Sequence, residues 1–360
     1  MKFKTENIPA SFGSMEKFQQ IAAQFLSIPV ADIDVAVIEV GLINATYLIT
    51  NRNTSQNCIL QKINTTVFKD VSALVHNTSS AVAVLQQSDY PLEVSSVIAT
   101  KEGAPIFYDE DGNPWRMFTY IENSITLSKA TSPIIAFEAA KAFSKFYKTM
   151  NSNGYVIQLQ VVLPDFINFE KRITDYKSAL ETATEERKLN AESAIQFINE
   201  HIGLPDKWIE LQTNNQLPKR IIHADPKISN VLFHQDTNEA IAVIDLDTVM
   251  EGTLLYDFGD MIRSYTNTAN EDEISTNETF DPELFMATKK GFLFSLETVL
   301  EPVEKENLDY AAKVVVYIQA VRFLTDYLNG DTYFYISYEN QNLYRTVNQI
   351  NLLKGILAFC

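Results

Sequence analysis

Two neighbouring stretches carry most of the information in this chain: Ile221-Ile-His-Ala-Asp-Pro-Lys-Ile-Ser-Asn-Val-Leu-Phe233 and Ile241-Ala-Val-Ile-Asp-Leu-Asp-Thr248. The apolar runs at 231–233 and 241–244 are typical of short buried strands. Polar side chains stand at the edges of these runs: Asp225, Lys227, Asn230, Asp245 and Asp247. An aspartate beside a buried strand is costly unless a positive group pairs with it, and a divalent metal is one such partner.

The order and spacing of these residues are those that phosphoryl transfer requires. A His-x-Asp-x-x-x-x-Asn loop places a catalytic base, Asp225, and a metal ligand, Asn230, close together. Asp245 follows at the end of a strand and is the second expected ligand for Mg²⁺. We expect Lys227 to neutralise the transferred phosphate and His223 to brace the loop. Any one of these residues alone would read as a turn or capping residue, but the set in this order predicts an ATP- and Mg²⁺-dependent kinase.

A second string, Tyr256-Asp-Phe-Gly-Asp260, imitates the metal-binding element of protein kinases. It lies too far along the chain from Asn230 to be the metal-binding element, and a helical pattern begins at it. We therefore interpret Asp257 as a helix N-cap or a brace for the loop, and assign the metal to Asp245.

Periodicity divides the chain into a β-rich and a helical part. The first part predicts a helix at 71–87, capped by Asp70, and strands at 35–40, 45–50, 58–63, 105–108 and 115–121. The second part predicts helices at 136–150, 170–200, 202–212, 282–300, 305–328 and 340–358. The expected fold class is α+β, with a small β-rich N-terminal lobe (1–121) and a larger, mainly helical C-terminal lobe (122–360).

Composition narrows the function classes. The 360 residues are 46% hydrophobic and 21% charged, which is typical of a globular protein. The net charge of −17 makes nucleic acid and anionic membranes poor partners, since both are negatively charged. No apolar run is long enough to span a membrane, the N-terminus lacks a signal pattern, and there are only two cysteines, so we expect a cytoplasmic protein. The oligomeric state leaves no trace in the sequence.

The catalytic stretches and three further motifs resemble the aminoglycoside phosphotransferase and choline kinase superfamily, which has a protein-kinase-like two-lobe fold. The resemblance is closest to the N-acetylhexosamine 1-kinases. The further motifs are Leu60-Gln-Lys-Ile-Asn64 with Val67-Phe-Lys-Asp70, Val243-Ile-Asp-Leu-Asp-Thr-Val-Met250 with Tyr256-Asp-Phe-Gly-Asp260, and Val321-Arg-Phe-Leu-Thr-Asp-Tyr-Leu-Asn-Gly-Asp-Thr-Tyr333.

This resemblance implies that a small molecule, an N-acetyl sugar, is phosphorylated at its anomeric oxygen by ATP and Mg²⁺. It suggests Thr248, Arg322 and Tyr333 as substrate residues, and we add Asp247, which follows the same strand. The other interpretation of Arg322 is an ion pair with Asp326, its i+4 neighbour.

We expect the residues that bind the nucleotide to lie in the loop between the first two strands and at the end of the third strand. Gly41 and Asn44 lie in a loop whose backbone amides are expected to face phosphate, although the loop has one glycine and not the three of Gly-x-Gly-x-x-Gly. Lys62 ends a strand where protein kinases carry the phosphate-binding lysine; otherwise it is an exposed edge-strand residue. The helix at 71–87 contains no Asp or Glu, so either Asp70 or no carboxylate pairs with Lys62.

Three alternatives stay open at this point. In the first, the enzyme is still a small-molecule kinase, but its acceptor is an amino alcohol or an aminoglycoside. A cationic acceptor of this kind would bind to a patch of carboxylates, and the acidic run Glu271-Asp-Glu273 could form one. The poor glycine loop also allows a non-catalytic, nucleotide-binding pseudokinase. A protein-substrate kinase is the third, but no Ala-Pro-Glu element follows Asp245.

Overall fold

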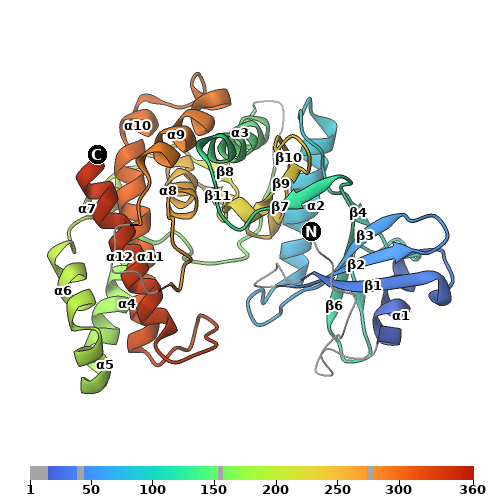
Figure 1. Cartoon of the computed structure of the whole chain (residues 1–360), viewed down its shortest axis with the longest axis horizontal. Coiled ribbons are helices and arrows are strands. Elements are labelled where there is room, and N and C mark those ends of the chain that lie inside the picture. The colour runs from blue at the N-terminus through green and yellow to red at the C-terminus, as the bar shows by residue number, and fades with distance from the viewer. Residues whose placement is uncertain (1–14, 39–43, 153–156, 274–278) are drawn as a thin grey trace. The chain divides into compact units, whose positions relative to one another are not determined.

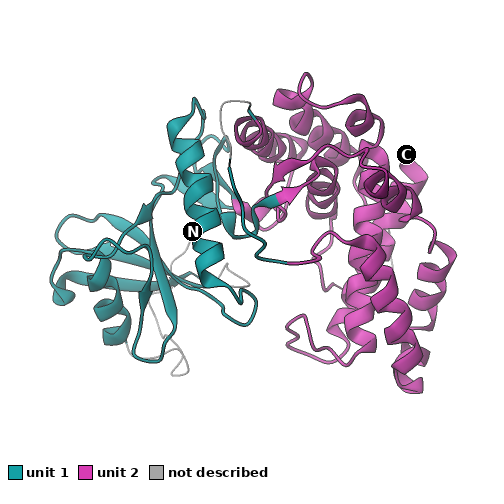
Figure 2. Ribbon diagram, turned by 180° about the vertical axis from the view of Figure 1, so that it is seen from behind, with its two compact units in different colours: residues 1–126, 152–163, 231–250 teal, residues 127–151, 164–230, 251–360 magenta. Residues whose placement is uncertain are grey.

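The computed structural model describes residues 15–38, 44–152, 157–273 and 279–360. The chain divides into two compact units, which Figure 2 draws in teal and magenta. The first unit consists of 1–126, 152–163 and 231–250, and the second of 127–151, 164–230 and 251–360. The first unit therefore takes two segments from later parts of the chain. The lobe boundary expected after residue 121 stays a prediction.

An antiparallel sheet forms the body of the first unit (Figure 1). Its strand order is β1-β2-β3-β6-β4, and β5 pairs with β6. The strands are β1 (Ile33–Ile38), β2 (Ala45–Asn51), β3 (Asn57–Lys62), β4 (Val97–Ile98), β5 (Phe107–Tyr108) and β6 (Pro114–Thr119). The strands predicted at 45–50 and 58–63 match β2 and β3 closely. In the register of the sheet, Gln61 lies opposite Thr46 on one side and Arg116 on the other.

One face of this sheet is covered by a helix that we did not predict, α1 (Met15–Phe25). Its buried residues, among them Phe18 and Ile21, recur at helical spacing and join one core with Tyr47 and Trp115. The ring centroids of Phe18 and Tyr47 are 4.5 Å apart. The apolar period of three to four residues was thus present in the sequence.

The helix predicted at 71–87 is confirmed as α2 (Val71–Gln87), and its cap is Asp70, whose Oδ1 accepts a hydrogen bond from the Ala73 N–H (2.9 Å). A three-stranded sheet of order β10-β9-β7 belongs to the same unit and is built from β7 (Ser124–Thr126), β9 (Val231–His234) and β10 (Ala240–Val243). After β10 the chain enters a short 3-10 helix, η4 (Leu246–Thr248), which packs on α2.

The second unit is mainly helical. Its long helices are α3 (Pro133–Met150), α4 (Phe169–Thr182), α8 (Leu254–Tyr265), α9 (Pro282–Leu296), α11 (Leu308–Leu328) and α12 (Gln341–Phe359). Its shorter elements are α5 (Glu185–Asn190), α6 (Glu192–Glu200), α7 (Asp206–Thr213), η3 (Ile228–Asn230) and α10 (Pro302–Glu306). Strand β8 (Arg220–Ile222) pairs with β11 (Met250–Gly252), and η2 (Val30–Asp32) completes the first unit.

The single helix expected at 170–200 is wrong, because the chain forms α4, α5 and α6 there. Ala183 has an extended backbone (φ −62°, ψ 149°) that ends α4. Thr184 then starts a new helix, since its Oγ1 accepts a hydrogen bond from the Arg187 N–H (3.3 Å). A threonine followed by two glutamates is a helix-start signal that apolar spacing alone does not detect.

Helix α8 lies in the centre of the second unit and packs closely on α11. A Cβ added at Gly259 would come within 2.6 Å of the Ala311 carbonyl oxygen, so only glycine allows this approach. The architecture is therefore α+β, with a β-rich N-terminal part and a mainly helical C-terminal part, as predicted. Of the helices described, none combines the length and apolarity needed to cross a membrane.

Candidate active site

The loop between β8 and β9 brings three of the predicted residues together. Lys227 Nζ lies 2.5 Å from Asp225 Oδ2. Asn230 Nδ2 donates to the same oxygen (3.1 Å) and to the Asp225 carbonyl (2.8 Å). The amide group of Asn230 thus faces the predicted base, and its Oδ1 is the atom that can ligate a metal. All three residues belong to the second unit.

The charges around Asp225 favour its ionised form. Burial acts to raise its pKa, but the ammonium of Lys227 outweighs burial, with smaller contributions from His223 and Arg263. The pKa of Asp225 therefore lies below its ordinary value. A carboxylate in this state at neutral pH is able to accept a proton.

The loop has a strained backbone that α8 holds in place. Ala224 has a φ of 64°, in the left-handed region that residues with a Cβ rarely adopt. The carboxylate of Asp257 on α8 accepts hydrogen bonds from the N–H groups of His223 (2.7 Å) and Ala224 (3.1 Å). It also accepts from the hydroxyl of Tyr147 (2.7 Å). Such a clamp stabilises an unfavourable backbone next to a functional residue.

The interpretation of Asp257 as a loop brace is therefore confirmed, whereas Thr253 and not Asp257 is the N-cap of α8. Burial raises the pKa of Asp257 to about 7, against the three hydrogen bonds that favour its ionised form. Two further residues of α8 hold the same loop: Tyr265 Oη donates to the Pro226 carbonyl (2.9 Å), and Ser264 Oγ accepts from the Ile228 N–H (3.3 Å).

His223 is fully buried beneath the loop. Its ring meets Phe143 and Phe146 edge-on, at centroid distances of 5.1 Å and 5.8 Å. Its Nδ1 accepts a hydrogen bond from the Asp225 N–H (3.3 Å), which is the bracing contact that the sequence predicted.

Arg322, one of the predicted substrate residues, lies between two aromatic rings. Its guanidinium carbon is 5.4 Å from the ring centroids of both Phe166 and Phe334, and Nη1 donates to Gln319 (2.9 Å). The alternative ion pair with Asp326 is wrong for the residues that the structure describes, since that carboxylate is bound elsewhere. The cation is thus held by stacking and by Gln319, and its role as a substrate residue stays a prediction.

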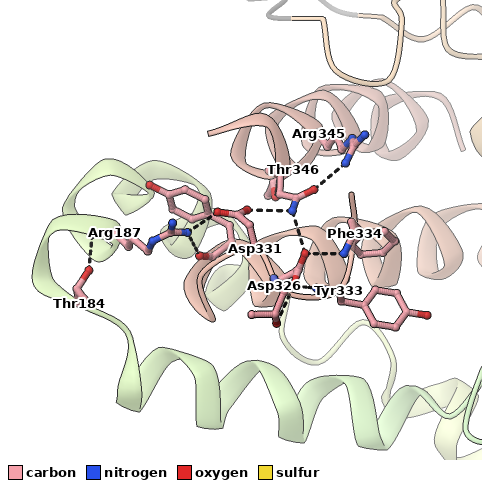
Figure 3. Close-up of polar contacts among 11 residues, drawn as sticks. Thr184, Arg187, Asp326, Asp331, Tyr333, Phe334, Arg345 and Thr346 are labelled. Atoms are coloured by element: carbon pink, nitrogen blue, oxygen red, sulfur yellow. Dashed lines mark hydrogen bonds and ion pairs between the residues drawn. The ribbon is translucent and has the colours of Figure 1, made fainter. Parts of the chain in front are cut away.

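The segment after α11 is held by Asp326, as Figure 3 shows. The buried carboxylate accepts hydrogen bonds from the N–H groups of Thr332 (2.9 Å), Tyr333 (2.8 Å) and Phe334 (2.9 Å). Asn342 Nδ2 on α12 donates to it as well (2.9 Å). Tyr333 itself is 68% exposed, so its side chain is accessible to a ligand.

A second carboxylate of this segment ties it to α5. Asp331 receives Arg187 Nη1 (2.7 Å) and Asn342 Nδ2 (2.9 Å). The same guanidinium donates to the Tyr327 carbonyl and lies 4.7 Å from the Tyr327 ring centroid. The segment that carries Tyr333 is therefore fixed from three helices, α5, α11 and α12.

The remaining predicted residues belong to the first unit. Lys62 ends β3 and, among the residues described, forms no ion pair; Asp70 caps α2 instead. Asn44 is buried, while Gly41 lies outside the described residues. Asp245 adopts a left-handed backbone (φ 63°, ψ 58°) at the start of η4.

Thr248 is buried within η4, and its predicted role as a substrate residue stays a prediction. Asp247 is only 2% exposed, and its Oδ2 accepts hydrogen bonds from Arg116 Nη2 (2.7 Å) and Asn44 Nδ2 (2.8 Å). The predicted contact between Asp247 and the acceptor stays a prediction. The hydrogen bonds of Asp247 to Arg116 and Asn44 indicate that it braces the first unit.

The donor chemistry of these residues fits the predicted metal. Carboxylate and amide oxygens are the ligands that Mg²⁺ prefers, and Asn230 and Asp245 supply one of each. In the described part of the chain, no group of three or more His, Cys, Asp or Glu side chains is arranged to hold a metal. Asn230 and Asp245 lie in different units, so their convergence on one ion stays a prediction.

Sequence reasoning missed two functional candidates, Arg116 and Asp326. Arg116 stands in the apolar strand pattern Pro114-Trp-Arg-Met-Phe-Thr119, where a lone cation needs a partner, and this was a usable signal. Asp326 was considered only as a partner for Arg322. No local pattern announces a carboxylate that binds three backbone N–H groups six to eight residues later.

Comparison with known proteins identifies the fold. The chain resembles three solved kinases, each at 14% sequence identity and over nearly its whole length. A microcompartment-associated aminopropanol kinase has a TM-score of 0.59, with 96% of this chain and 97% of that one covered. A choline kinase from Cryptosporidium parvum has a TM-score of 0.58 (96% of this chain, 98% of that one), and a spectinomycin phosphotransferase solved with ADP and spectinomycin has a TM-score of 0.58 (91% and 93%). At this sequence identity the similarity concerns the fold alone, and it confirms the prediction of a protein-kinase-like fold.

The model of the phosphotransferase enzyme family matches residues 34–281, more than half of the chain. The match includes the loop from His223 to Asn230 and the strand that precedes Asp245. It confirms the prediction of an enzyme that transfers phosphoryl groups. This chain belongs to the phosphotransferase enzyme family.

Proposed function

We propose that the protein transfers the γ-phosphoryl group of ATP, with Mg²⁺, to a hydroxyl of a small molecule, and that this hydroxyl is the anomeric one of an N-acetylhexosamine. One observation carries the proposal: Lys227 and Asn230 both contact the carboxylate of Asp225, in the order that a phosphotransferase loop requires.

In this proposal Asp225 is the general base. Its lowered pKa keeps it ionised at neutral pH, so that it accepts the proton of the attacking hydroxyl. Lys227 holds a positive charge beside the base, where the transferred group carries negative charge. Asn230 and Asp245 would hold the metal, and Lys62 with the loop of Gly41 and Asn44 would bind ATP. When bound, Mg²⁺ neutralises charge on the phosphates.

The acceptor is argued from Arg322. Among the residues that the structure describes, no carboxylate forms an ion pair with the Arg322 guanidinium. Such a cation repels a cationic acceptor and donates hydrogen bonds to hydroxyl or carbonyl oxygens, which an N-acetyl sugar offers. The acidic run that a cationic acceptor would need is already engaged, since Glu271 pairs with Arg263 (3.1 Å) and Asp272 accepts from Gln341 (2.9 Å). Thr248, Tyr333 and Arg322 are the proposed sugar residues.

The test is a phosphorus NMR spectrum of the product formed from N-acetylglucosamine and ATP. We expect the signal of an anomeric phosphate; a 6-phosphate would contradict the regiochemistry. Asp225→Asn is expected to abolish transfer while MgATP binding stays measurable by calorimetry. Full activity in this variant would overturn the assignment of the base.

An amino alcohol is the second candidate acceptor, because two of the similar structures are an aminopropanol kinase and a choline kinase. A screen with radiolabelled ATP across N-acetyl sugars, amino alcohols and aminoglycosides separates the candidates. Preference for a cationic acceptor would contradict the role given to Arg322. No transfer to any acceptor, with MgATP still bound, would favour a nucleotide-binding pseudokinase.

A further inference from the structure

The first unit contains a buried ion pair that the proposed mechanism does not use. Arg116 Nη1 and Nη2 each lie 2.7 Å from a carboxylate oxygen of Asp247, Oδ1 and Oδ2 respectively. Arg116 is 3% exposed and Asp247 is 2% exposed. Nη2 donates a hydrogen bond to Oδ2, whereas the Nη1 contact is an ion-pair distance without hydrogen-bond geometry. Both groups are shielded from water, where a contact between opposite charges is strong.

Three more polar residues complete this cluster. Gln61 Oε1 accepts from Arg116 Nε (3.1 Å) and Nη2 (2.9 Å). Asn44 Nδ2 donates to Asp247 Oδ2 (2.8 Å), and Thr78 Oγ1 lies 3.5 Å from Oδ1. We call Asn44, Gln61, Thr78, Arg116 and Asp247 the Arg116–Asp247 cluster.

Within the described residues, the cluster joins the segments of the first unit that carry Asn44, Lys62 and Asp245. Gln61 precedes Lys62 on β3, and Arg116 lies opposite Gln61 on β6. Asp247 follows Asp245 by two residues, within η4. Asn44 also accepts a hydrogen bond at Oδ1 from the Asn64 N–H (3.0 Å), so it connects the start of β2 with the segment after β3.

Helix α2 is attached to the same cluster through Thr78. In protein kinases a lysine on the third strand pairs with a glutamate on the following helix. Helix α2 has no Asp or Glu, and Lys62 forms no ion pair within the described residues. The link from sheet to helix is made here by Arg116, Asp247 and Thr78 instead.

We propose that Arg116 and Asp247 are positioning residues for MgATP, which hold Asn44, Lys62 and Asp245 in the arrangement that binds the nucleotide. This inference rests on the proposed function and gives Asp247 a role different from the acceptor contact that the sequence predicted. Because the pair is buried, it acts through its neighbours and touches neither ATP nor acceptor.

The experiment measures MgATP dissociation constants by calorimetry, without acceptor, together with KM for ATP and for the acceptor. We expect Asp247→Asn to weaken MgATP binding tenfold or more and to raise KM for ATP, with KM for the acceptor unchanged. Arg116→Lys keeps the charge but loses the hydrogen bonds of the guanidinium to Gln61 and Asp247, so a smaller weakening is expected. It serves as the second variant, because Asp247→Asn leaves a buried cation and risks unfolding.

Asp109→Asn is the matched control. Asp109 is another buried carboxylate of the same unit, bound by Trp115 Nε1 (3.0 Å) and by Asn113, and no member of the Arg116–Asp247 cluster contacts it. We expect Asp109→Asn to lower the unfolding temperature while the MgATP dissociation constant stays within twofold of wild type. Circular dichroism establishes that each variant is folded before binding is measured.

Two results would overturn the positioning role alone. One is unchanged MgATP affinity in folded Asp247→Asn and Arg116→Lys, with KM raised only for the acceptor, which would restore the substrate role of Asp247. The other is an equal loss of affinity in Asp109→Asn, which would make the effect one of general stability. Wild-type protein that binds no MgATP would overturn the proposed function and the positioning role together.

Discussion

The carboxylate of Asp247 in the first unit meets a guanidinium, whereas that of Asp257 in the second unit meets two backbone N–H groups and a phenol. Both side chains are buried. The ion pair joins side chains of distant elements and fixes how strands and helix are spaced. The hydrogen-bonded carboxylate clamps one strained loop, and the described groups that bond to it include no cation, so burial raises its pKa to about 7. Two ways of burying a carboxylate thus give different consequences for stability and pH.

The largest effect is expected from breaking the ion pair on one side. Asp247→Leu leaves the Arg116 cation buried without a partner and should cost about 3–5 kcal/mol in the free energy of unfolding. The double variant Arg116→Met/Asp247→Leu removes both charges and should recover at least half of that loss. Chemical denaturation measures both; a double variant as unstable as the single one would show that the two residues are not coupled.

Asp257 permits no such rescue, because its partners include the backbone. Asp257→Ala leaves the N–H groups of His223 and Ala224 without acceptors and should cost about 3 kcal/mol, with a large loss of phosphoryl transfer. Asp281→Ala, which removes the N-cap of α9 in the same unit, should cost about 1 kcal/mol and leave the activity of folded molecules unchanged. Equal activity losses in both variants would contradict the clamp.

The pH dependence separates the two carboxylates further. Asp257 binds its proton in the folded state up to about pH 7, while the unfolded carboxyl loses it near pH 4. Its contribution to stability is therefore full below pH 4 and is lost as the pH rises towards 7. The groups that face it are Tyr147, Asp260 and the backbone N–H groups of His223 and Ala224. Relative to Asp257→Asn, wild type should lose about 2 kcal/mol between pH 5 and pH 7. A pH-independent difference in unfolding free energy would contradict the raised pKa.

The smallest effect is expected from Tyr147→Phe, which removes one hydrogen bond to Asp257 and should cost about 1 kcal/mol. This hydrogen bond lowers the pKa of Asp257. Its loss should therefore raise the pH range over which the contribution of Asp257 to stability is lost. Denaturation curves recorded across the same pH range measure the change. A downward move would mean that the phenol favours the protonated carboxyl.

Local patterns predicted a large part of this molecule. The spacing from His223 to Asn230 predicted a tight loop braced by His223, and strand and helix periods predicted β2, β3 and α2 closely. The pattern of α1 was present and overlooked, and the helix start at Thr184 was hidden inside a longer apolar period. These features depend on residues a few positions apart, which is the range over which backbone sterics and capping act.

The residue sequence by itself determined the family and the arrangement of a β-rich part before a helical part, because residues close together in the chain specify both. Only the tertiary structure decided which charges meet. Arg116 and Asp247 are 131 positions apart, and Tyr147 and Asp257 are 110 apart. It also showed that Asp326 accepts hydrogen bonds from backbone N–H groups, whereas Arg322 stacks on aromatic rings. Partners this distant are selected by burial, since a buried polar group must find whichever complementary group the fold brings to it.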